Sequence, residues 1–338
     1  MVLIDIWFFL LGIFLIVYVI LDGFDLGGAF ISPFLSNDDR DRRVVLNAIG
    51  RVWDANEVWL ISFGVFLFGI FPAAYARFFS AAYIPVMLLV FMLIFRAVAF
   101  EFRSQVESKV WRSVWDWVLS ISSILIVIIL SAAGANVMKG VQMTDEPFRL
   151  HLFDALNPFA LITSITVASF VVLHGLMYLA NKTEGSLYKK IISFSKINWV
   201  VSLILLIVWL VFSIIFEKHI FYNFLKYPIF LLVPLVVVIA FVLLRVFLER
   251  ENIRNSFIMS VISIGGVILS FGLSMYPVLI RSSIDEKYNI TIYNSASGEL
   301  TLIIGLVVAI IGLVLVAIYQ GFVYKSFAGK IKDEDIHY

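Results

Sequence analysis

The run IWFFLLGIFLIVYVIL, residues 6–21, contains no charged residue and ends at Asp22. A helix needs about 20 apolar residues to cross the hydrocarbon core of a bilayer, because each residue rises about 1.5 Å and the backbone must satisfy its own hydrogen bonds. The run is short for that task, so we expect its helix to continue past Asp22 toward Pro33. This stretch predicts a membrane-spanning helix with acidic residues close to one end.

The rest of the sequence has the same apolar character. Hydrophobic residues make up 62% of the 338 residues and charged residues only 14%, whereas soluble domains have about 45–50% and about 25%. So much apolar surface requires lipid as its solvent. The sequence therefore predicts an all-α polytopic membrane protein with nine transmembrane helices, at residues 6–21, 58–76, 78–95, 117–138, 155–181, 197–216, 227–244, 255–280 and 300–324.

The basic residues predict the direction of these helices. If the N-terminus lies outside, the segments on the cytoplasmic side hold 18 Lys and Arg and the outer segments hold seven. Lys and Arg near membrane spans favour the cytoplasmic side, so we expect an outer N-terminus, a cytoplasmic C-terminus and a cytoplasmic tail at 325–338. The loops are short and have no Pro/Ser-rich linker, which predicts one transmembrane domain over residues 1–338.

Composition also excludes several kinds of site. The net charge of +1 gives no reason to expect a nucleic-acid partner. The absence of cysteine rules out disulfides, iron–sulfur clusters and thiolate haem ligation in this chain. Four histidines are too few for the core of a haem–copper oxidase, and His151, His219 and His337 fall in predicted loops or the tail. His174 is within a predicted helix, where a hydrogen-bonded histidine of the bundle is favoured over a haem ligand.

Ionisable residues of the first helices gather near the cytoplasmic side. Asp22 and Asp25 are three residues apart, so they share a helix face, and the glycines around them let another helix approach closely. Asp54 and Glu57 share a face at the start of the second helix. Ionisable groups inside a membrane are costly and usually functional. The same layer also contains Arg96, Glu101, Asp116 and His174.

Three interpretations of this layer remain open. The groups can be structural, with carboxylates paired to arginines at the membrane surface, and a helix N-terminus favours Asp54 and Glu57 in any case. They can form a proton-entry region, because carboxylates in a low-dielectric layer accept and release protons near neutral pH. An ion-coupled secondary transporter also has intramembrane carboxylates, but it would place them near the midplane.

Several local stretches resemble the second subunit of cytochrome bd-type quinol oxidases. They extend from the first predicted helix to the last, and the Trp-Asp-x-Asn-Glu-Val-Trp run is the most specific of them. One departure is Ala55, where the family more often has glycine. The matching stretches are LDGFDLG (21–27), WDANEVWLI (53–61), FP (71–72), YA (75–76), Arg96, EFR (101–103), HG (174–175), YLA (178–180), KTEG (182–185), YP (276–277), YNITIYN (288–294) and YQG (319–321).

The resemblance implies two four-helix bundles, at 6–138 and 155–280, and a peripheral ninth helix at 299–324. It also implies a partner, subunit I, that carries two b-type haems, haem d and the quinol site, while this chain ligates no haem. The complex would oxidise quinol, reduce oxygen to water and draw protons from the cytoplasm, in the cytoplasmic (inner) membrane of a prokaryote. A small accessory subunit, membrane lipid and a structural quinone are further expectations.

The resemblance also suggests roles for individual residues. Asp54, Asp25 and Asp22, in falling order, are the candidates for a proton path toward the haems of subunit I, and Glu57 is a weaker candidate that we expect to anchor structure. No catalytic residue and no metal ligand is expected in this chain. The structural polar candidates are Arg96, Glu101, Arg103, His174, Trp53, Asn56 and Trp59.

Overall fold

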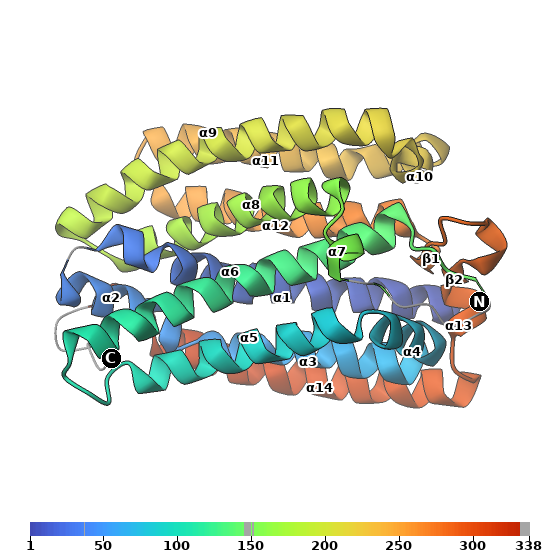
Figure 1. The fold of residues 1–338 in the computed structure, drawn as a ribbon, viewed down its shortest axis with the longest axis horizontal. Coiled ribbons are helices and arrows are strands. Elements are labelled where there is room, and N and C mark those ends of the chain that lie inside the picture. Colours follow the sequence, from blue (N-terminus) through green and yellow to red (C-terminus); the bar gives the residue numbers. More distant parts are fainter. Residues whose placement is uncertain (37, 145–149, 151, 332–338) are drawn as a thin grey trace.

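The computed structural model describes residues 1–36, 38–144, 150 and 152–331, and these residues are mostly helical (Figure 1). His151 and His337 therefore lie outside the described residues. The longer helices are α1 (Val2–Leu35), α2 (Asp39–Gly50), α3 (Trp53–Ile70), α4 (Pro72–Ala81), α5 (Tyr83–Phe102), α6 (Lys109–Lys139), α8 (Pro158–Lys182), α9 (Gly185–Phe216), α11 (Leu232–Glu249), α12 (Ile253–Met275) and α14 (Glu299–Ser326).

Short elements connect these helices. Strands β1 (Val278–Ile280) and β2 (Ile290–Thr291) pair antiparallel between α12 and α14. The other short elements are α7 (Leu152–Ala155), η1 (Lys218–Phe221), α10 (Tyr222–Lys226), η2 (Pro228–Leu231), η3 (Glu286–Tyr288) and α13 (Ile292–Ser295).

Eight helices of the described chain are long and apolar enough to cross a membrane, and the number rises to as many as nine if the bent pair of α3 and α4 forms one span. The nine predicted stretches each correspond to one of these units. The chain is therefore a multi-pass helical membrane protein.

Three of the predicted stretches differ from the helices, and a proline explains the first difference. Residues 58–76 do not form one straight helix, because α3 ends at Ile70 and α4 starts at Pro72 with a bend of 117° between them. Proline has no amide hydrogen and disfavours the helical conformation of the residue before it, and Phe71 has φ −124° and ψ 61°. The third predicted stretch, 78–95, starts too early, since α5 begins only at Tyr83. The eighth, 255–280, ends too late, since α12 ends at Met275 and Val278–Ile280 form β1.

The prediction for the first helix is confirmed. α1 continues without a break through Asp22 and Asp25, contains Pro33 and ends at Leu35. Its apolar start faces lipid or neighbouring helices, whereas nearly all of residues 22–35 are buried. The acidic residues are therefore carried into the interior of the molecule by an uninterrupted helix.

The helices pack in layers that run along the long axis of the molecule (Figure 1). α9 and α11 form one outer layer, and α8 packs against α9 as α12 packs against α11. α1 and α6 lie in the middle and contact α8. On the far side, α3 packs against α1, α5 against α6, and α14 against α3. α1 therefore has neighbours on both sides of the molecule.

α1 and α8 approach closely because glycines lie at their crossing. A Cβ atom on Gly27 would overlap the carbonyl oxygen of Val171, and one on Gly175 would overlap the backbone nitrogen of Gly28. Glycine at such positions lets two backbones come into contact. This crossing fixes the height of Asp22 and Asp25 relative to His174 on α8.

The two ends of the molecule differ. At one end lie α2 and the turn between α5 and α6, and we call this the α2 end (Figure 1). At the other end lie β1, β2 and α13, close to the start of α1 (Figure 1). Asp54 and Asp116, at the starts of α3 and α6, both lie toward the α2 end.

Candidate functional site

Asp22, Arg96 and Glu57 form a buried ion-pair group between α1, α5 and α3. Asp22 accepts from Arg96 with both carboxylate oxygens, at 2.5 Å from Nη2 and 3.0 Å from Nη1. Arg96 Nη1 also lies 3.0 Å from Oε2 of Glu57. The side chains of Asp22 and Arg96 are 0% and 1% exposed, and that of Glu57 is 15% exposed. One guanidinium therefore ties three helices together.

Asp25 is one turn further along α1 and contacts no cationic side chain among the described residues. Its Oδ2 accepts from Asn56 Nδ2 at 2.6 Å, while its Oδ1 is buried and has no hydrogen-bond partner among the described residues. Asn56 is oriented in turn by α14, because Tyr324 donates its hydroxyl to Asn56 Oδ1 at 2.8 Å. Asp25 is thus a buried carboxyl group held at one oxygen and open at the other.

Asp54 lies at the start of the same helix as Asn56 and Glu57 but is exposed. The acidic groups of this region therefore pass from exposed Asp54, through partly buried Glu57, to fully buried Asp22 and Asp25. We refer to Asp22, Asp25, Asn56, Glu57 and Arg96 as the carboxyl cluster.

Two tryptophans flank the carboxyl cluster. Trp53 stacks on Phe100 with ring centroids 5.7 Å apart, and Arg96 lies over its ring at 5.8 Å. Trp59 is buried against Phe14, and its indole nitrogen has no hydrogen-bond partner among the described residues. Trp53 therefore contacts the cluster through Arg96.

His174 is a hydrogen-bonded bundle residue, as the sequence favoured. Its Nε2 donates to the carbonyl of Ile20 at 2.8 Å, and its Nδ1 lies 2.8 Å from the hydroxyl of Ser260. The ring stacks on Phe257 with an interplanar angle of 5°. Both ring nitrogens are occupied, so neither is free to bind haem iron in this arrangement.

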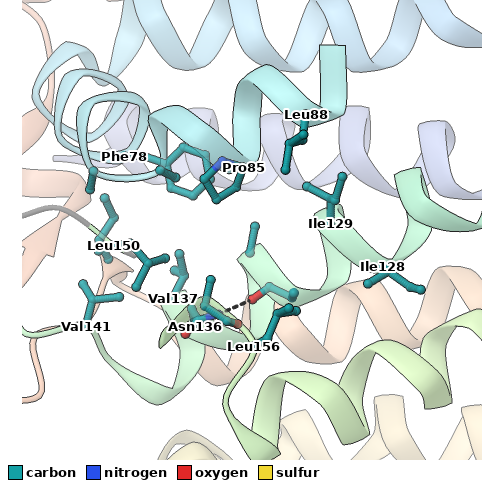
Figure 2. Close-up of a pocket in the computed structure, with 16 residues that line it drawn as sticks. Phe78, Pro85, Leu88, Ile128, Ile129, Asn136, Val137, Val141, Leu150 and Leu156 are labelled. Carbon is teal, nitrogen blue, oxygen red and sulfur yellow. Dashed lines mark hydrogen bonds between the residues drawn. The ribbon is translucent and has the colours of Figure 1, made fainter. Parts of the chain in front are cut away.

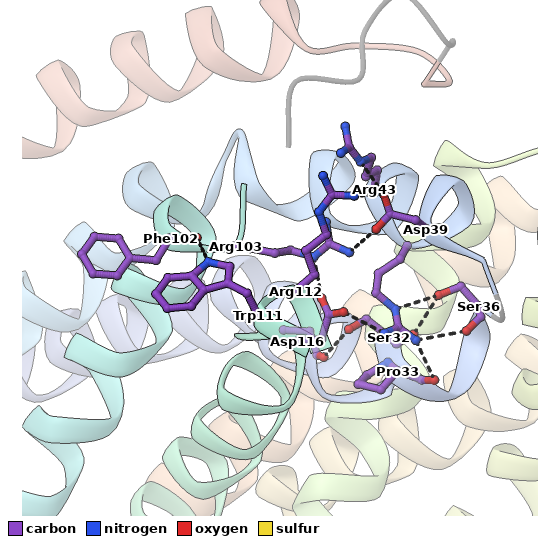
Figure 3. Close-up of polar contacts among 12 residues, drawn as sticks. Ser32, Pro33, Ser36, Asp39, Arg43, Phe102, Arg103, Trp111, Arg112 and Asp116 are labelled. Carbon is purple, nitrogen blue, oxygen red and sulfur yellow. Dashed lines mark hydrogen bonds and ion pairs between the residues drawn. The ribbon is translucent and has the colours of Figure 1, made fainter. Parts of the chain in front are cut away.

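The remaining polar candidates separate into two groups. Arg103 is buried and belongs to a second network at the α2 end, where its Nε lies 2.6 Å from Asp116 Oδ1 and its Nη2 lies 2.8 Å from Asp39 Oδ1 (Figure 3). Glu101 is exposed and belongs to neither network. Arg96 and Arg103 are seven residues apart on one helix end, yet they serve separate ion-pair groups.

A small cavity lies far from these charges, near the opposite end of α6 (Figure 2). It measures about 70 Å³ and is lined almost entirely by carbon atoms of α4, α5 and α6. Asn136 is its polar side chain, and the amide of Asn136 already donates to the carbonyls of Ala132 and Ala155. A cavity that binds a benzene ring measures about 150 Å³, so a quinone ring does not fit here.

No group of three or more His, Asp or Glu side chains in the described chain is arranged to hold a metal ion.

Sequence reasoning missed residues that complete both polar networks. The first of them is Tyr324 on α14. Gln320 and Tyr324 are four residues apart and form a polar face on an otherwise apolar helix, which is the signal that could have identified them. Gln320 donates to the carbonyl of Ala55 at 3.0 Å. Asp39 and Arg42 were also missed, because they fall in a polar loop region where charge carries no signal about pairing.

Three comparisons with known proteins agree with one another. The family model described as cytochrome bd terminal oxidase subunit II matches residues 3–327. Cytochrome bd-I ubiquinol oxidase subunit 2 of Escherichia coli (strain K12) is 30% identical over 362 residues, which cover 98% of this chain and 96% of that protein.

Cytochrome bd ubiquinol oxidase subunit 2 of Bacillus subtilis (strain 168) is 28% identical, with 98% and 97% of the two chains covered. Among solved structures, a chain of the bd oxidase from Geobacillus thermodenitrificans matches with a TM-score of 0.81 over 97% of this chain and 99% of that one, at 18% identity. The last match shows that the folds are alike.

Proposed function

Because the chain belongs to the cytochrome bd terminal oxidase subunit II family, we propose that its carboxyl cluster takes up protons for the chemistry of the oxidase complex. The chain is a subunit of a cytochrome bd quinol oxidase, an oxidoreductase complex. The reduction of one oxygen molecule to two water molecules consumes four electrons and four protons. A membrane enzyme of this kind needs a path for those protons through apolar surroundings.

Asp25 is the observation on which this proposal depends most. It is 0% exposed, and one of its carboxylate oxygens has no partner among the described residues. A group that carries protons must be able to exchange its partners, which a carboxylate locked on both oxygens does poorly. Asp22 is locked in that way by Arg96, so Asp25 is the better carrier and Asp22 holds the site together.

The charge of the cluster also supports proton uptake. Asp22 and Glu57 share the single guanidinium of Arg96, and Asp25 has no cationic partner among the described residues. If all three carboxyl groups were ionised, the interior would hold surplus negative charge, which is costly without a compensating cation. Bound protons relieve this surplus. Exposed Asp54 lies at the entrance, and the partly exposed Glu57 lies next along α3.

We place the α2 end on the cytoplasmic side and the start of α1 outside. This assignment rests on the 18 to seven distribution of Lys and Arg. We also propose two bundles, residues 6–138 and 155–280, with α14, which packs against α3, as the peripheral helix. Residues 325–338 then form a cytoplasmic tail, and the membrane is the cytoplasmic membrane of a prokaryotic cell.

We also assign two b-type haems, haem d and the quinol site to subunit I. His174 offers no free nitrogen, so the described part of this chain suits a supporting role. A small accessory subunit and membrane lipid complete the proposed complex. A structural quinone, if bound, needs a site other than the small carbon-lined cavity.

Replacement of Asp25 by Asn in the assembled oxidase tests the proton role. Loss of a positioned proton carrier typically lowers the rate by about 100-fold or more, so we expect oxygen consumption with quinol to fall strongly while the haem spectrum of the complex stays normal. Glu101→Gln removes an exposed carboxylate from the same region and should leave turnover unchanged. Full turnover of Asp25→Asn with normal haem content would leave this subunit a purely structural role.

The rival interpretation, an ion-coupled secondary transporter, is not favoured. The carboxyl groups lie toward the α2 end rather than at mid-membrane, and relatives along the whole chain are oxidase subunits.

A further inference from the structure

Four arginines surround two aspartates at the α2 end (Figure 3). Asp39 on α2 is bound by Arg103 through Oδ1 at 2.8 Å, and through Oδ2 by Arg43 and Arg112, both at 2.9 Å. Asp116 on α6 is bound by Arg42 at 2.7 Å and by Arg103 at 2.6 Å. We call Arg42, Arg43, Arg103 and Arg112 the arginine cluster.

The aspartates cannot satisfy the arginine cluster. Four guanidinium groups face two carboxylates, which leaves a surplus of two positive charges, and all four carboxylate oxygens are already used. Two N–H donors of the arginine cluster remain without an acceptor. Nη1 of Arg103 and Nε of Arg112 are buried and have no hydrogen-bond partner among the described residues, and the Arg103 side chain is only 3% exposed. Buried donors without an acceptor are rare in proteins.

The surface next to the cluster is apolar and exposed. α6 starts at Lys109, and Val110, Val114 and Trp117 on its outward face are 74%, 53% and 44% exposed. The same stretch borders an open groove lined by Lys109, Val110, Ser113, Val114, Trp117 and Val118. Such residues on a membrane-spanning helix face acyl chains, and tryptophan marks the depth of the lipid headgroups.

We propose that the arginine cluster binds the phosphate of an anionic phospholipid, whose acyl chains lie along the groove of α6. A phosphate supplies the negative charge and the acceptor oxygens that the cluster lacks, and arginine binds phosphate through paired N–H donors. Arg112 and Asp116 of the charged group lie on the same turns of α6 as the residues of the apolar groove, so this part of the surface suits a molecule that is anionic at one end and hydrocarbon at the other. The proposal is independent of the proton role of the carboxyl cluster.

The test uses the purified oxidase complex in nanodiscs. Discs made with phosphatidylglycerol are compared with discs of phosphatidylcholine, and lipids retained by the complex after exchange into detergent are identified by native mass spectrometry. We expect phosphatidylglycerol to be retained, and Arg112→Gln to weaken its retention about fivefold, since one basic residue near an anionic surface is worth about that factor. Arg112→Lys, which keeps the charge, should retain more lipid than Arg112→Gln.

Arg254→Gln is the matched control, because Arg254 is an exposed arginine at the start of α12 and its loss removes the same charge from the complex. It should leave the retention of phosphatidylglycerol unchanged. A second arm adds inorganic phosphate to the delipidated complex, and a thermal stabilisation equal to that given by phosphatidylglycerol would assign the site to free phosphate. Equal retention of phosphatidylglycerol by wild type and Arg112→Gln would overturn the proposal.

Discussion

Asp22 and Asp25 are one turn apart on α1, yet their surroundings differ in kind. Asp22 is the bidentate partner of a buried arginine, whereas Asp25 contacts only the neutral amide of Asn56. A buried charge that loses its partner is strongly destabilising, but a carboxyl group beside an amide can change its protonation without such a loss. Replacement by asparagine should therefore cause different defects at Asp22 and at Asp25.

Asp22→Asn should impair assembly. The substitution leaves the buried guanidinium of Arg96 with Glu57 as its remaining anionic partner, at a cost of about 3–5 kcal/mol. We expect the amount of haem-containing complex in membranes to fall, measured from the haem spectrum per milligram of membrane protein. Asp25→Asn should assemble to nearly the wild-type level. Normal assembly of Asp22→Asn would show that the ion pair does not hold α1 to α5.

Tyr324→Phe should slow turnover without affecting assembly. The hydroxyl of Tyr324 orients the amide of Asn56 toward Asp25, and loss of one such hydrogen bond is worth about 0.5–1.5 kcal/mol. We expect the rate of oxygen consumption to fall about twofold to tenfold, with unchanged haem content and a shifted dependence of rate on pH.

Tyr319→Phe is the matched control for this variant. Tyr319 is on the same helix but is 48% exposed, so its hydroxyl should not affect the rate. Equal rates for the two variants would exclude a positioning role for Tyr324.

The sequence predicts the residues of the carboxyl cluster better than it predicts their contacts. The spacing of Asp22 and Asp25 places them on one face, and charge in an apolar helix marks them as unusual. The pairing of Asp22 with Arg96 spans 74 residues and that of Asn56 with Tyr324 spans 268. Such contacts depend on how the helices pack, and hydropathy contains no information about the rotation of one helix against another.

At the scale of elements, the crossing of α1 and α8 sets the geometry of the polar interior. Gly175→Ala should destabilise it, because the new Cβ would overlap the backbone of Gly27 and Gly28. Overpacking of this kind costs about 1–3 kcal/mol or more. We expect a lower melting temperature of the complex, followed through the loss of its haem absorbance.

Gly272→Ala on α12 is the control for the crossing. An added Cβ at Gly272 meets no atom within 4 Å, and alanine favours the helix over glycine by about 1 kcal/mol, so stability should stay equal or rise. A similar loss of stability in both variants would mean that an added methyl group destabilises the complex for a reason other than contact between α1 and α8.

The docking of α2 should depend on pH through Asp39. Partial burial acts to raise the pKa of Asp39, but hydrogen bonds and charge from Arg103, Arg43 and Arg112 outweigh it and lower that pKa below its usual value. A lowered pKa in the folded state means that the stabilisation is present at neutral pH and is lost as the pH falls through the lowered value. Asp39→Asn should therefore speed amide hydrogen exchange in α2 at pH 7. The difference from wild type should begin to shrink below about pH 4 and disappear once the pH is below the lowered pKa of Asp39.

Asp41 provides a control on the same helix, because its pKa is shifted in the opposite direction from that of Asp39. Burial, and then the charge of Asp38, raise the pKa of Asp41, so its ionised form weakens the folded state at neutral pH. Asp41→Asn should leave hydrogen exchange in α2 unchanged or slower at pH 7. Faster exchange in both variants would indicate that α2 loosens for reasons other than the network around Asp39.

The sequence predicts the boundaries of a helix where neighbouring residues alone determine them. The apolar run at 6–21 is too short to cross the membrane alone, which predicts that its helix continues past Asp22, and α1 has that form. Hydropathy does not predict the bend at Phe71, because it continues unchanged across the break, although Pro72 signals it.

At the scale of the whole molecule, both polar networks lie toward the α2 end. The carboxyl cluster opens there through Asp54, and the arginine cluster lies there on α2, α5 and α6. This position of both networks at one end suits an oxidase that takes its protons from one compartment. Protons that enter from the other compartment would cancel the separation of charge across the membrane. Proton uptake by the carboxyl cluster therefore depends on which compartment the α2 end faces.

The lack of cysteine in the chain allows a direct measurement of that orientation. Single cysteines are introduced as Ser104→Cys, after α5 at the α2 end, and Ser283→Cys, after β1 at the opposite end; both positions are exposed. Whole cells are treated with a membrane-impermeant maleimide, and labelling of this subunit is read after separation on a gel. We expect Ser283→Cys to react in whole cells and Ser104→Cys to react only in inverted vesicles, because Lys and Arg gather on the cytoplasmic side. Labelling of Ser104→Cys from outside would place the entrance at Asp54 in the wrong compartment for proton uptake, and the carboxyl cluster would then have to be explained as a structural core.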